Sequence, residues 1–177
     1  MSNARNIADL GDGITGADLP AGSVLQVVST TKTDTFTTTS ASYTDVTGLS
    51  ASITPTSASS KILVSYQISL GNSGYLSYSR IVRDSTPIAI ADAAGSRPLT
   101  TASTGWYVPT NVVYNSGPVC MDFLDSPSTT SEITYKVQVR TYDASHFAVV
   151  NRTYSDRDTS AYEPRMVSTI TVMEIAG

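Results

Sequence analysis

Two stretches of the chain alternate apolar and polar residues with a period of two. Between residues 60 and 70 the apolar positions are Ile62, Val64, Tyr66, Ile68 and Leu70. Between residues 132 and 142 they are Ile133, Tyr135, Val137 and Val139. Successive side chains of a β-strand point to opposite faces of the sheet, so this period predicts strands with one buried face. Leu63 is the only apolar residue that breaks the alternation in the first stretch.

The remaining chain from Ser23 onward predicts further short strands. Together with the two above, the expected strands are 23–30, 34–39, 46–53, 60–70, 75–84, 87–91, 110–124, 132–142, 146–154 and 165–175. Gly, Pro, Asn, Asp and Ser separate them, and no window shows the 3.6-residue period of an amphipathic helix. This spacing predicts an all-β chain, an antiparallel two-sheet jelly-roll sandwich, in which residues 91–109 form a long irregular connection.

Residues 1–22 differ from the rest of the chain in their high content of Gly and Asp. Their apolar residues are widely spaced: Ile7, Leu10, Ile14 and Leu19. Because such a segment buries too little apolar surface to order itself, we expect these four residues to insert into a partner. The chain therefore divides into an extended N-terminal anchoring segment, 1–22, and a head domain, 23–177.

The last predicted strand, 165–175, carries apolar residues on both faces near its end. They are Ile170, Val172, Met173 and Ile175. A strand that is apolar on both faces is buried on both faces, and in a small sandwich another subunit has to supply the second covering surface. These four residues are therefore predicted to line an interface between subunits.

Composition and charge narrow the range of partners. Only 15% of the 177 residues are charged, and Ser and Thr carry much of the polar surface. The formal net charge of -4 gives no basic surface for nucleic acid or an anionic membrane. No apolar run approaches the roughly 20 residues of a membrane span, and no secretory signal begins the chain. We expect a protein made in the cytoplasm, without membrane insertion.

No residues have the spacing of a catalytic site. His146 lies near Asp143, Ser145 and Ser155 in the sequence, but a strained Gly-x-Ser-x-Gly elbow is missing. Cys120 is the only cysteine, and its apolar neighbours predict a thiol packed as a small hydrophobe. We expect no enzymatic activity and no cofactor.

Two alternatives concern loops. Asp9, Asp12, Thr15 and Asp18 could offer oxygen ligands to Ca²⁺, although their spacing differs from that of an EF-hand. Exposed aromatic side chains beside polar residues commonly contact carbohydrate or protein surfaces. Three such residues are candidate receptor contacts: Trp106, Tyr107 and Tyr114. The alternative is that Trp106 closes one end of the sandwich.

Three blocks of the sequence stand out: PAGSVLQVV at 20–28, YTDVTGLSASITP at 43–55 leading into SSKILV at 59–64, and STITVMEI at 168–175. Together they resemble small structural proteins of tailed bacteriophages. The resemblance covers about a third of the chain. It implies a tail-fibre or head-decoration protein with a trimeric jelly-roll head similar to the tumour-necrosis-factor and complement-C1q heads, and with no catalytic residues. Residues 6–9 and 14–17 resemble the attachment segments of such fibres.

The resemblance implies a non-enzymatic virion protein, made in the host cytoplasm and placed on the outer surface of the phage particle. As a short tail fibre it would be a homotrimeric, surface-projecting knob, held to other virion proteins by its N-terminal segment and in contact with a host glycan or protein. One alternative is a capsid decoration or cement protein that stabilises the head. The alternative from another class is a soluble carbohydrate-binding module.

Overall fold

The computed structural model describes residues 19–105, 115–159 and 161–177. In these ranges the chain forms eleven strands and no helix. The strands are β1 (Val24–Lys32), β2 (Phe36–Thr38), β3 (Thr44–Ile53), β4 (Lys61–Asn72), β5 (Ser77–Arg83), β6 (Thr86–Ile88), β7 (Ala102–Thr104), β8 (Ser116–Asp125), β9 (Ile133–Thr141), β10 (Ala148–Val150) and β11 (Ser168–Ile175). Consequently no helix in the described ranges is long and apolar enough to cross a membrane.

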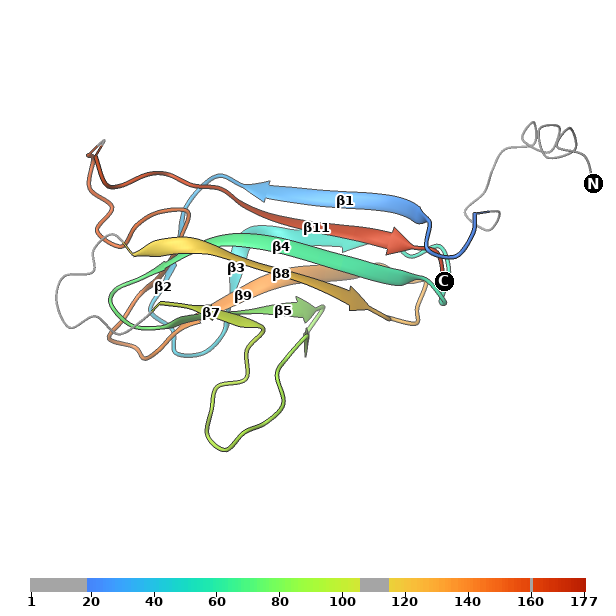
Figure 1. Ribbon diagram of the computed structural model, residues 1–177, viewed down its shortest axis with the longest axis horizontal. Helices are drawn as coiled ribbons and strands as arrows, with labels where there is room; N and C mark the ends of the chain where they lie inside the picture. Colours follow the sequence, from blue (N-terminus) through green and yellow to red (C-terminus); the bar gives the residue numbers. More distant parts are fainter. Residues whose placement is uncertain (1–18, 106–114, 160) are drawn as a thin grey trace, which may run out of the picture.

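The strands form two antiparallel sheets that pack face to face (Figure 1). Sheet A has the order β1-β11-β4-β8, and β10 continues along the edge of β4 beyond β11 and pairs with β2. Sheet B has the order β3-β9-β5, with β6 and β7 both paired to the far edge of β5. The predicted all-β, two-sheet antiparallel sandwich is therefore confirmed.

Two strand predictions need correction. β7 lies within the connection 91–109 that was expected to be irregular, because its three residues are too few to show an alternation. β10 is much shorter than the expected 146–154, because Asn151 takes a positive φ of 62° and leaves the extended conformation. Asn is one of the few residues that tolerate this left-handed region, and it ends the strand here.

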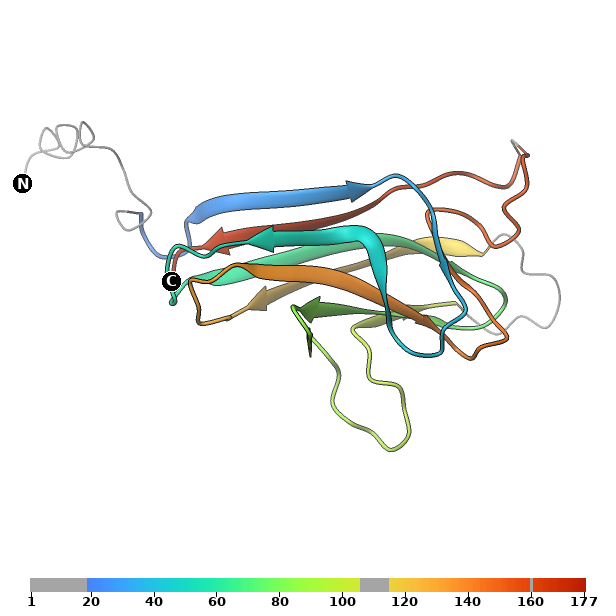
Figure 2. The ribbon, with the colours of Figure 1, turned by 180° about the vertical axis from the view of Figure 1, so that it is seen from behind.

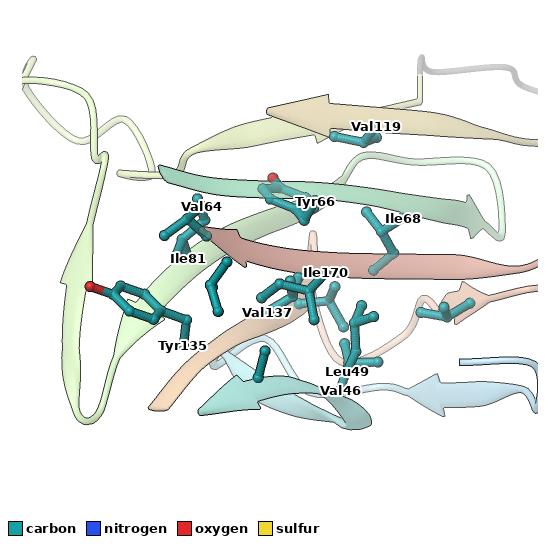
Figure 3. Packing of buried hydrophobic residues seen from close by; sticks show 14 of the residues in the cluster. Val46, Leu49, Val64, Tyr66, Ile68, Ile81, Val119, Tyr135, Val137 and Ile170 are labelled. Carbon is teal, nitrogen blue, oxygen red and sulfur yellow. The ribbon is translucent and has the colours of Figure 1, made fainter. Parts of the chain in front are cut away.

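The core lies between the sheets and is built from the inner faces of the predicted strands (Figure 3). On β4 the inward side chains include Ile62, Val64, Tyr66 and Ile68, and on β9 they are Ile133, Tyr135, Val137 and Val139. Each is at most 2% exposed. Burial of such a side chain contributes roughly 1.5 to 3 kcal/mol, so the alternation of these two strands supplies much of the driving force for folding.

Polar side chains also join the two sheets. The Tyr135 hydroxyl donates to Asp125 Oδ2 at 2.7 Å, and Arg83 Nη1 donates to both carboxylate oxygens of Asp125 at 3.0 and 2.9 Å. Burial raises the pKa of the Tyr135 hydroxyl, and its bond to the carboxylate raises it further. Near the middle of the sandwich, Tyr66 Oη and Ser79 Oγ form a second bridge at 3.1 Å. These bonds fix how the sheets sit on each other.

The sandwich has two ends with different contents. The terminal end holds the beginning of β1 and the end of β11, and Gly22 N donates to Ala176 O there at 2.8 Å. The loop end holds the turns 73–76 and 142–147, together with the segment 151–167 between β10 and β11. Figure 2 shows the two ends from the opposite side. The residues just before β1, which we call the N-terminal connection, therefore lie at the end opposite to most of the long loops.

Candidate functional site

Four apolar side chains form a continuous row across the outer face of sheet A. The strand register pairs Val27 with Met173, Met173 with Leu63, and Leu63 with Leu124. Val27 is 54% and Leu124 is 48% exposed, and the other two side chains are half-buried. We call these four residues the apolar row. It lies in the half of the sheet nearer the terminal end.

The outer face is polar on the side of the apolar row that is farther from the terminal end. The next row along the four strands consists of Ser29, Thr171, Ser65 and Asp122. Ser29 Oγ and Thr171 Oγ1 share a hydrogen bond of 2.8 Å, which satisfies both hydroxyls on the sheet surface. These polar side chains bound the apolar row on one side, whereas Ile175, paired with Val24, extends the apolar surface toward the terminal end. Exposed apolar patches of this kind mark contact sites.

The predicted subunit contacts on β11 divide between its two faces. Ile170 and Val172 are 0% exposed and lie in the subunit's own core, so the prediction that they line an interface is wrong. The reason is the period of two, which sends residues 170 and 172 to the inner face. Met173 and Ile175 point to the outer face and remain predicted interface residues.

Of the four residues in the apolar row, the sequence predicted only Met173 as a contact residue. Val27 and Leu124 each lie in a strand whose apolar residues do not alternate cleanly, so their direction could not be assigned. The sequence feature that could have revealed the row is Leu63. It interrupts the alternation of β4 and contributes an apolar side chain to the otherwise polar outer face of this strand.

A buried carboxylate holds β11 in place beside these residues. Glu174 is 0% exposed, and its Oε1 accepts bonds of 2.7 Å from the backbone N and the Oγ1 of Thr56. Gln26 Nε2 donates to its Oε2 at 2.6 Å. Burial alone would raise the pKa of Glu174, but the hydrogen bonds outweigh it and lower the pKa. The carboxylate ties β11 to β1 and to the loop before β4.

Most of the proposed N-terminal contacts lie outside the described residues. Ile7, Leu10 and Ile14 belong to that part, and Leu19, the fourth, is 36% exposed. The ladder between β1 and β11 extends to the bond from Ala176 N to Ser23 O. The N-terminal connection therefore leaves the sandwich at the terminal end, where the apolar row lies.

The candidate receptor residues Trp106, Tyr107 and Tyr114 also lie outside the described residues. The residues that flank this connection meet at the loop end. Gly105 has a φ of 105° and approaches Asn72 so closely that an added Cβ would lie 2.5 Å from Asn72 Nδ2. Asn72 N in turn donates to Asn115 O at 3.3 Å. The two residues that flank 106–114, Gly105 and Asn115, therefore both lie beside Asn72.

His146 belongs to a group of rings at the loop end. Its Nδ1 lies 2.5 Å from Asp143 Oδ1, and Ser155 Oγ donates instead to Glu163. The Tyr75 ring lies 4.2 Å from the His146 ring and stacks on Tyr142 at 5.1 Å. We call Tyr75, Tyr142 and His146 the ring cluster. The sequence analysis missed it because it combines two turns that are distant in sequence.

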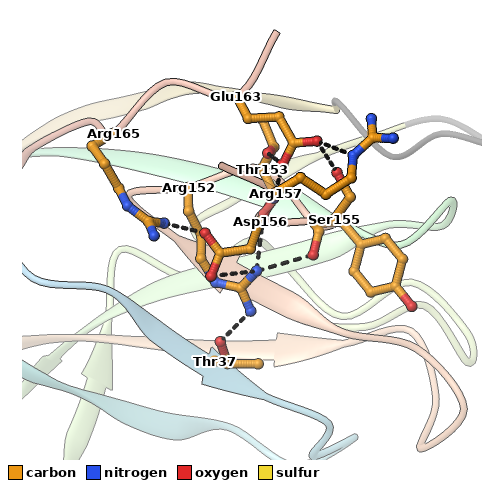
Figure 4. A network of polar contacts seen from close by, with 9 residues as sticks. Thr37, Arg152, Thr153, Ser155, Asp156, Arg157, Glu163 and Arg165 are labelled. Carbon is orange, nitrogen blue, oxygen red and sulfur yellow. Dashed lines mark hydrogen bonds and ion pairs between the residues drawn. The ribbon is translucent and has the colours of Figure 1, made fainter. Parts of the chain in front are cut away.

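The loop between β10 and β11 contains a network of charged groups (Figure 4). Glu163 accepts bonds from Ser155 Oγ at 2.5 Å and Arg157 Nε at 2.7 Å. Burial would raise the pKa of Glu163, but these hydrogen bonds outweigh it and lower the pKa to about 2. Arg165 pairs with Asp156 in the same loop. Because Arg157 and Arg165 are already paired with carboxylates, we infer that this network stabilises the loop.

The described residues contain no group of three or more His, Cys, Asp or Glu that could hold a metal ion. The alternative calcium ligands Asp9, Asp12, Thr15 and Asp18 lie outside this part of the chain. Cys120 is exposed, so the expectation of a thiol packed as a small hydrophobe is wrong. The cause is that Cys120 points outward on β8 while its neighbour Val119 points into the core.

Neither a family model nor a curated protein matches the chain.

Proposed function

We propose that the chain is a non-enzymatic structural subunit of a tailed bacteriophage, a homotrimer of jelly-roll heads on the outer surface of the particle. Residues 1–22 attach it to other virion proteins. The observation that carries the proposal is the exposed apolar row, since exposed apolar side chains on a sheet face are suited to packing against another subunit. The sequence blocks described above supply the link to phages.

The strand order supports the jelly-roll form of the sandwich. Sheet A has the order β1-β11-β4-β8, and sheet B has the order β3-β9-β5, with β6 and β7 both on the far edge of β5. Both sheets place late strands beside early ones, as happens when a long antiparallel ribbon is wrapped around a barrel-like core. The resemblance to tumour-necrosis-factor and C1q heads implies the same wrapped arrangement and a trimer.

The position of the two ends favours a projecting knob, such as a short tail fibre, over a flat decoration protein. The N-terminal connection leaves at the terminal end, beside the apolar row, while the ring cluster and the flanks of the 106–114 connection lie at the loop end. A subunit attached at one end can present the other to a host surface. The capsid decoration protein is the alternative within this class.

A soluble carbohydrate-binding module is the second candidate, and the ring cluster favours it. Tyr142 is 49% exposed at the start of the β9–β10 turn, and exposed aromatic rings are common in sugar-binding sites. A module of this kind needs neither a trimer nor an attachment segment. The oligomeric state therefore separates the two candidates.

The proposal is tested by the mass of the full chain in solution and by its position on the particle. Light scattering should give three times 18.7 kDa. Antibody-labelled electron microscopy of purified phage should place the chain on the outer surface. A monomer at micromolar concentration, or particles without label, would contradict the proposal.

A further inference from the structure

The ring cluster at the loop end lies beside the carboxylate of Asp143. Tyr75 comes from the turn between β4 and β5, whereas Tyr142 and His146 come from the turn between β9 and β10. The Tyr75 and Tyr142 rings stack with 22° between their planes, and the His146 ring meets Tyr142 edge-on at 6.2 Å. Three rings thus support one another in a fixed arrangement.

Tyr142 offers the accessible surface of this cluster. Tyr75 stacks on one face of its ring, and 49% of the residue is exposed, which leaves surface of this side chain accessible to a ligand. A ring held from behind by a stacked partner loses little freedom when a ligand stacks on its open face. The arrangement is that of a rigid platform.

Asp143 places hydrogen-bonding groups beside the platform. Its Oδ1 accepts from Ser145 N at 2.8 Å and lies 2.5 Å from His146 Nδ1. The Asp143 side chain is 46% exposed. Within the described ranges no hydrogen bond is formed by Asp143 Oδ2, which leaves this oxygen available as an acceptor. Asp143 Oδ1 thus holds the carboxylate in position, and Oδ2 can accept a hydrogen bond from a ligand.

We propose that the ring cluster and Asp143 bind a neutral pyranose unit of a surface glycan. The aliphatic C–H face of the sugar stacks on the open face of Tyr142, and Asp143 Oδ2 accepts from a sugar hydroxyl. The negative carboxylate, in a chain of net charge -4, disfavours acidic sugars. In the proposed function, this site makes the contact with the host surface. The inference therefore rests on that proposed function.

His146 is the only histidine of the chain, so the imidazole signals of the wild-type protein report on this site. The full chain is titrated with neutral hexasaccharides of glucose, galactose and N-acetylglucosamine, and with a sialylated oligosaccharide, while the imidazole signals of His146 are followed by NMR. At least one neutral hexasaccharide should shift these signals in a saturable manner, and the sialylated one should not. No binding of any neutral sugar, or binding that leaves the His146 signals unmoved, overturns the proposal.

Variants separate a ligand site from a structural cluster. Tyr142→Ala should weaken binding about tenfold, and Tyr142→Phe, which keeps the ring, should stay within about threefold of wild type. Tyr162→Ala removes another exposed tyrosine, 65% exposed, and should leave affinity unchanged. Loss of binding in Tyr162→Ala with retention in Tyr142→Ala overturns the assignment. The trimer mass and the particle labelling do not depend on sugar binding, so failure of this site leaves the proposed function testable by itself.

Discussion

Glu174 shows how one residue determines the position of a strand. Its carboxylate is fully buried at the terminal end, where burial of a charge is costly unless hydrogen bonds compensate. Gln26 and Thr56 supply those bonds from β1 and from the loop before β4. Because Met173 and Ile175 flank Glu174 on β11, the bonds that hold Glu174 inward also keep those two side chains directed outward.

Glu174→Gln should destabilise the protein at neutral pH by about 1 to 3 kcal/mol, since it replaces hydrogen bonds to a charged acceptor with weaker neutral ones. The folded-state pKa of Glu174 is lowered, so its contribution is present above the ordinary value of 4.5 and is lost as the pH falls below it. Urea unfolding at pH 7 and pH 3.5 measures this: the gap between wild type and variant should narrow at the lower pH.

The matched control is Glu132→Gln, which changes an exposed glutamate just before β9. Its free energy of unfolding should stay within about 0.5 kcal/mol of wild type at both pH values. An equal loss of stability in the two variants would show that the buried hydrogen bonds of Glu174 carry no special weight.

At the scale of the element, β11 has one face in the core and one on the surface. Its inner face carries Ile170 and Val172, both fully buried, and its outer face carries Met173 and Ile175. β11 pairs with β1 on one side and with β4 on the other, which makes it a central strand of sheet A. Substitutions on the two faces should therefore affect different properties.

Ile170→Ala should reduce the free energy of unfolding by about 2 to 5 kcal/mol, because it leaves a cavity between the sheets. Chemical unfolding of the variant and of wild type at equal concentration gives the difference. Thr169→Ala, on the outer face of the same strand, is the control and should change stability by less than about 1 kcal/mol. A small effect of Ile170→Ala would contradict the assignment of this side chain to the core.

Met173→Asp should dissociate the proposed trimer, because it places a carboxylate in the apolar row at a cost of several kcal/mol per interface. Light scattering should then report a monomer that retains the β-sheet circular dichroism of wild type. Thr47→Asp, an exposed position on β3 in sheet B, is the control and should remain trimeric. A trimeric Met173→Asp would place the interface away from the apolar row.

At the scale of the whole molecule, attachment and recognition are assigned to opposite ends of the sandwich. The ladder between β1 and β11 extends only to Gly22 and Ser23, close to the boundary expected between the anchoring segment and the head. Among the described residues, the buried apolar residues of the core lie between Val46 and Val172. The described residues 19–22 contribute none of them.

A truncated chain that begins at Ser23 should fold. Of the described residues 19–22 it loses two backbone hydrogen bonds, from Gly22 N to Ala176 O and from Ser23 N to Pro20 O, and no core side chain. It should no longer be incorporated into particles, since the predicted anchor residues Ile7, Leu10, Ile14 and Leu19 are removed. Circular dichroism tests folding, and immunoblots of purified particles test incorporation. Normal incorporation would locate the attachment elsewhere, and an unfolded product would assign the segment to the head.

The sequence by itself determined the strands with a regular alternation and the side of each that is buried. β4 and β9 were located to within one or two residues, and their inward residues form the core as expected. A period of two is a local property of the chain, and it survives because packing and pattern agree there. The all-β class and the two-sheet sandwich follow from such strands.

Only the tertiary structure decided what faces outward and which surfaces come together. The sequence of β11 is apolar on both sides, and packing against sheet B selected Ile170 and Val172 for the core. The apolar row depends on the register of four strands, and the ring cluster joins turns about 70 residues apart. Register and turn proximity are set by long-range pairing, which no local pattern encodes.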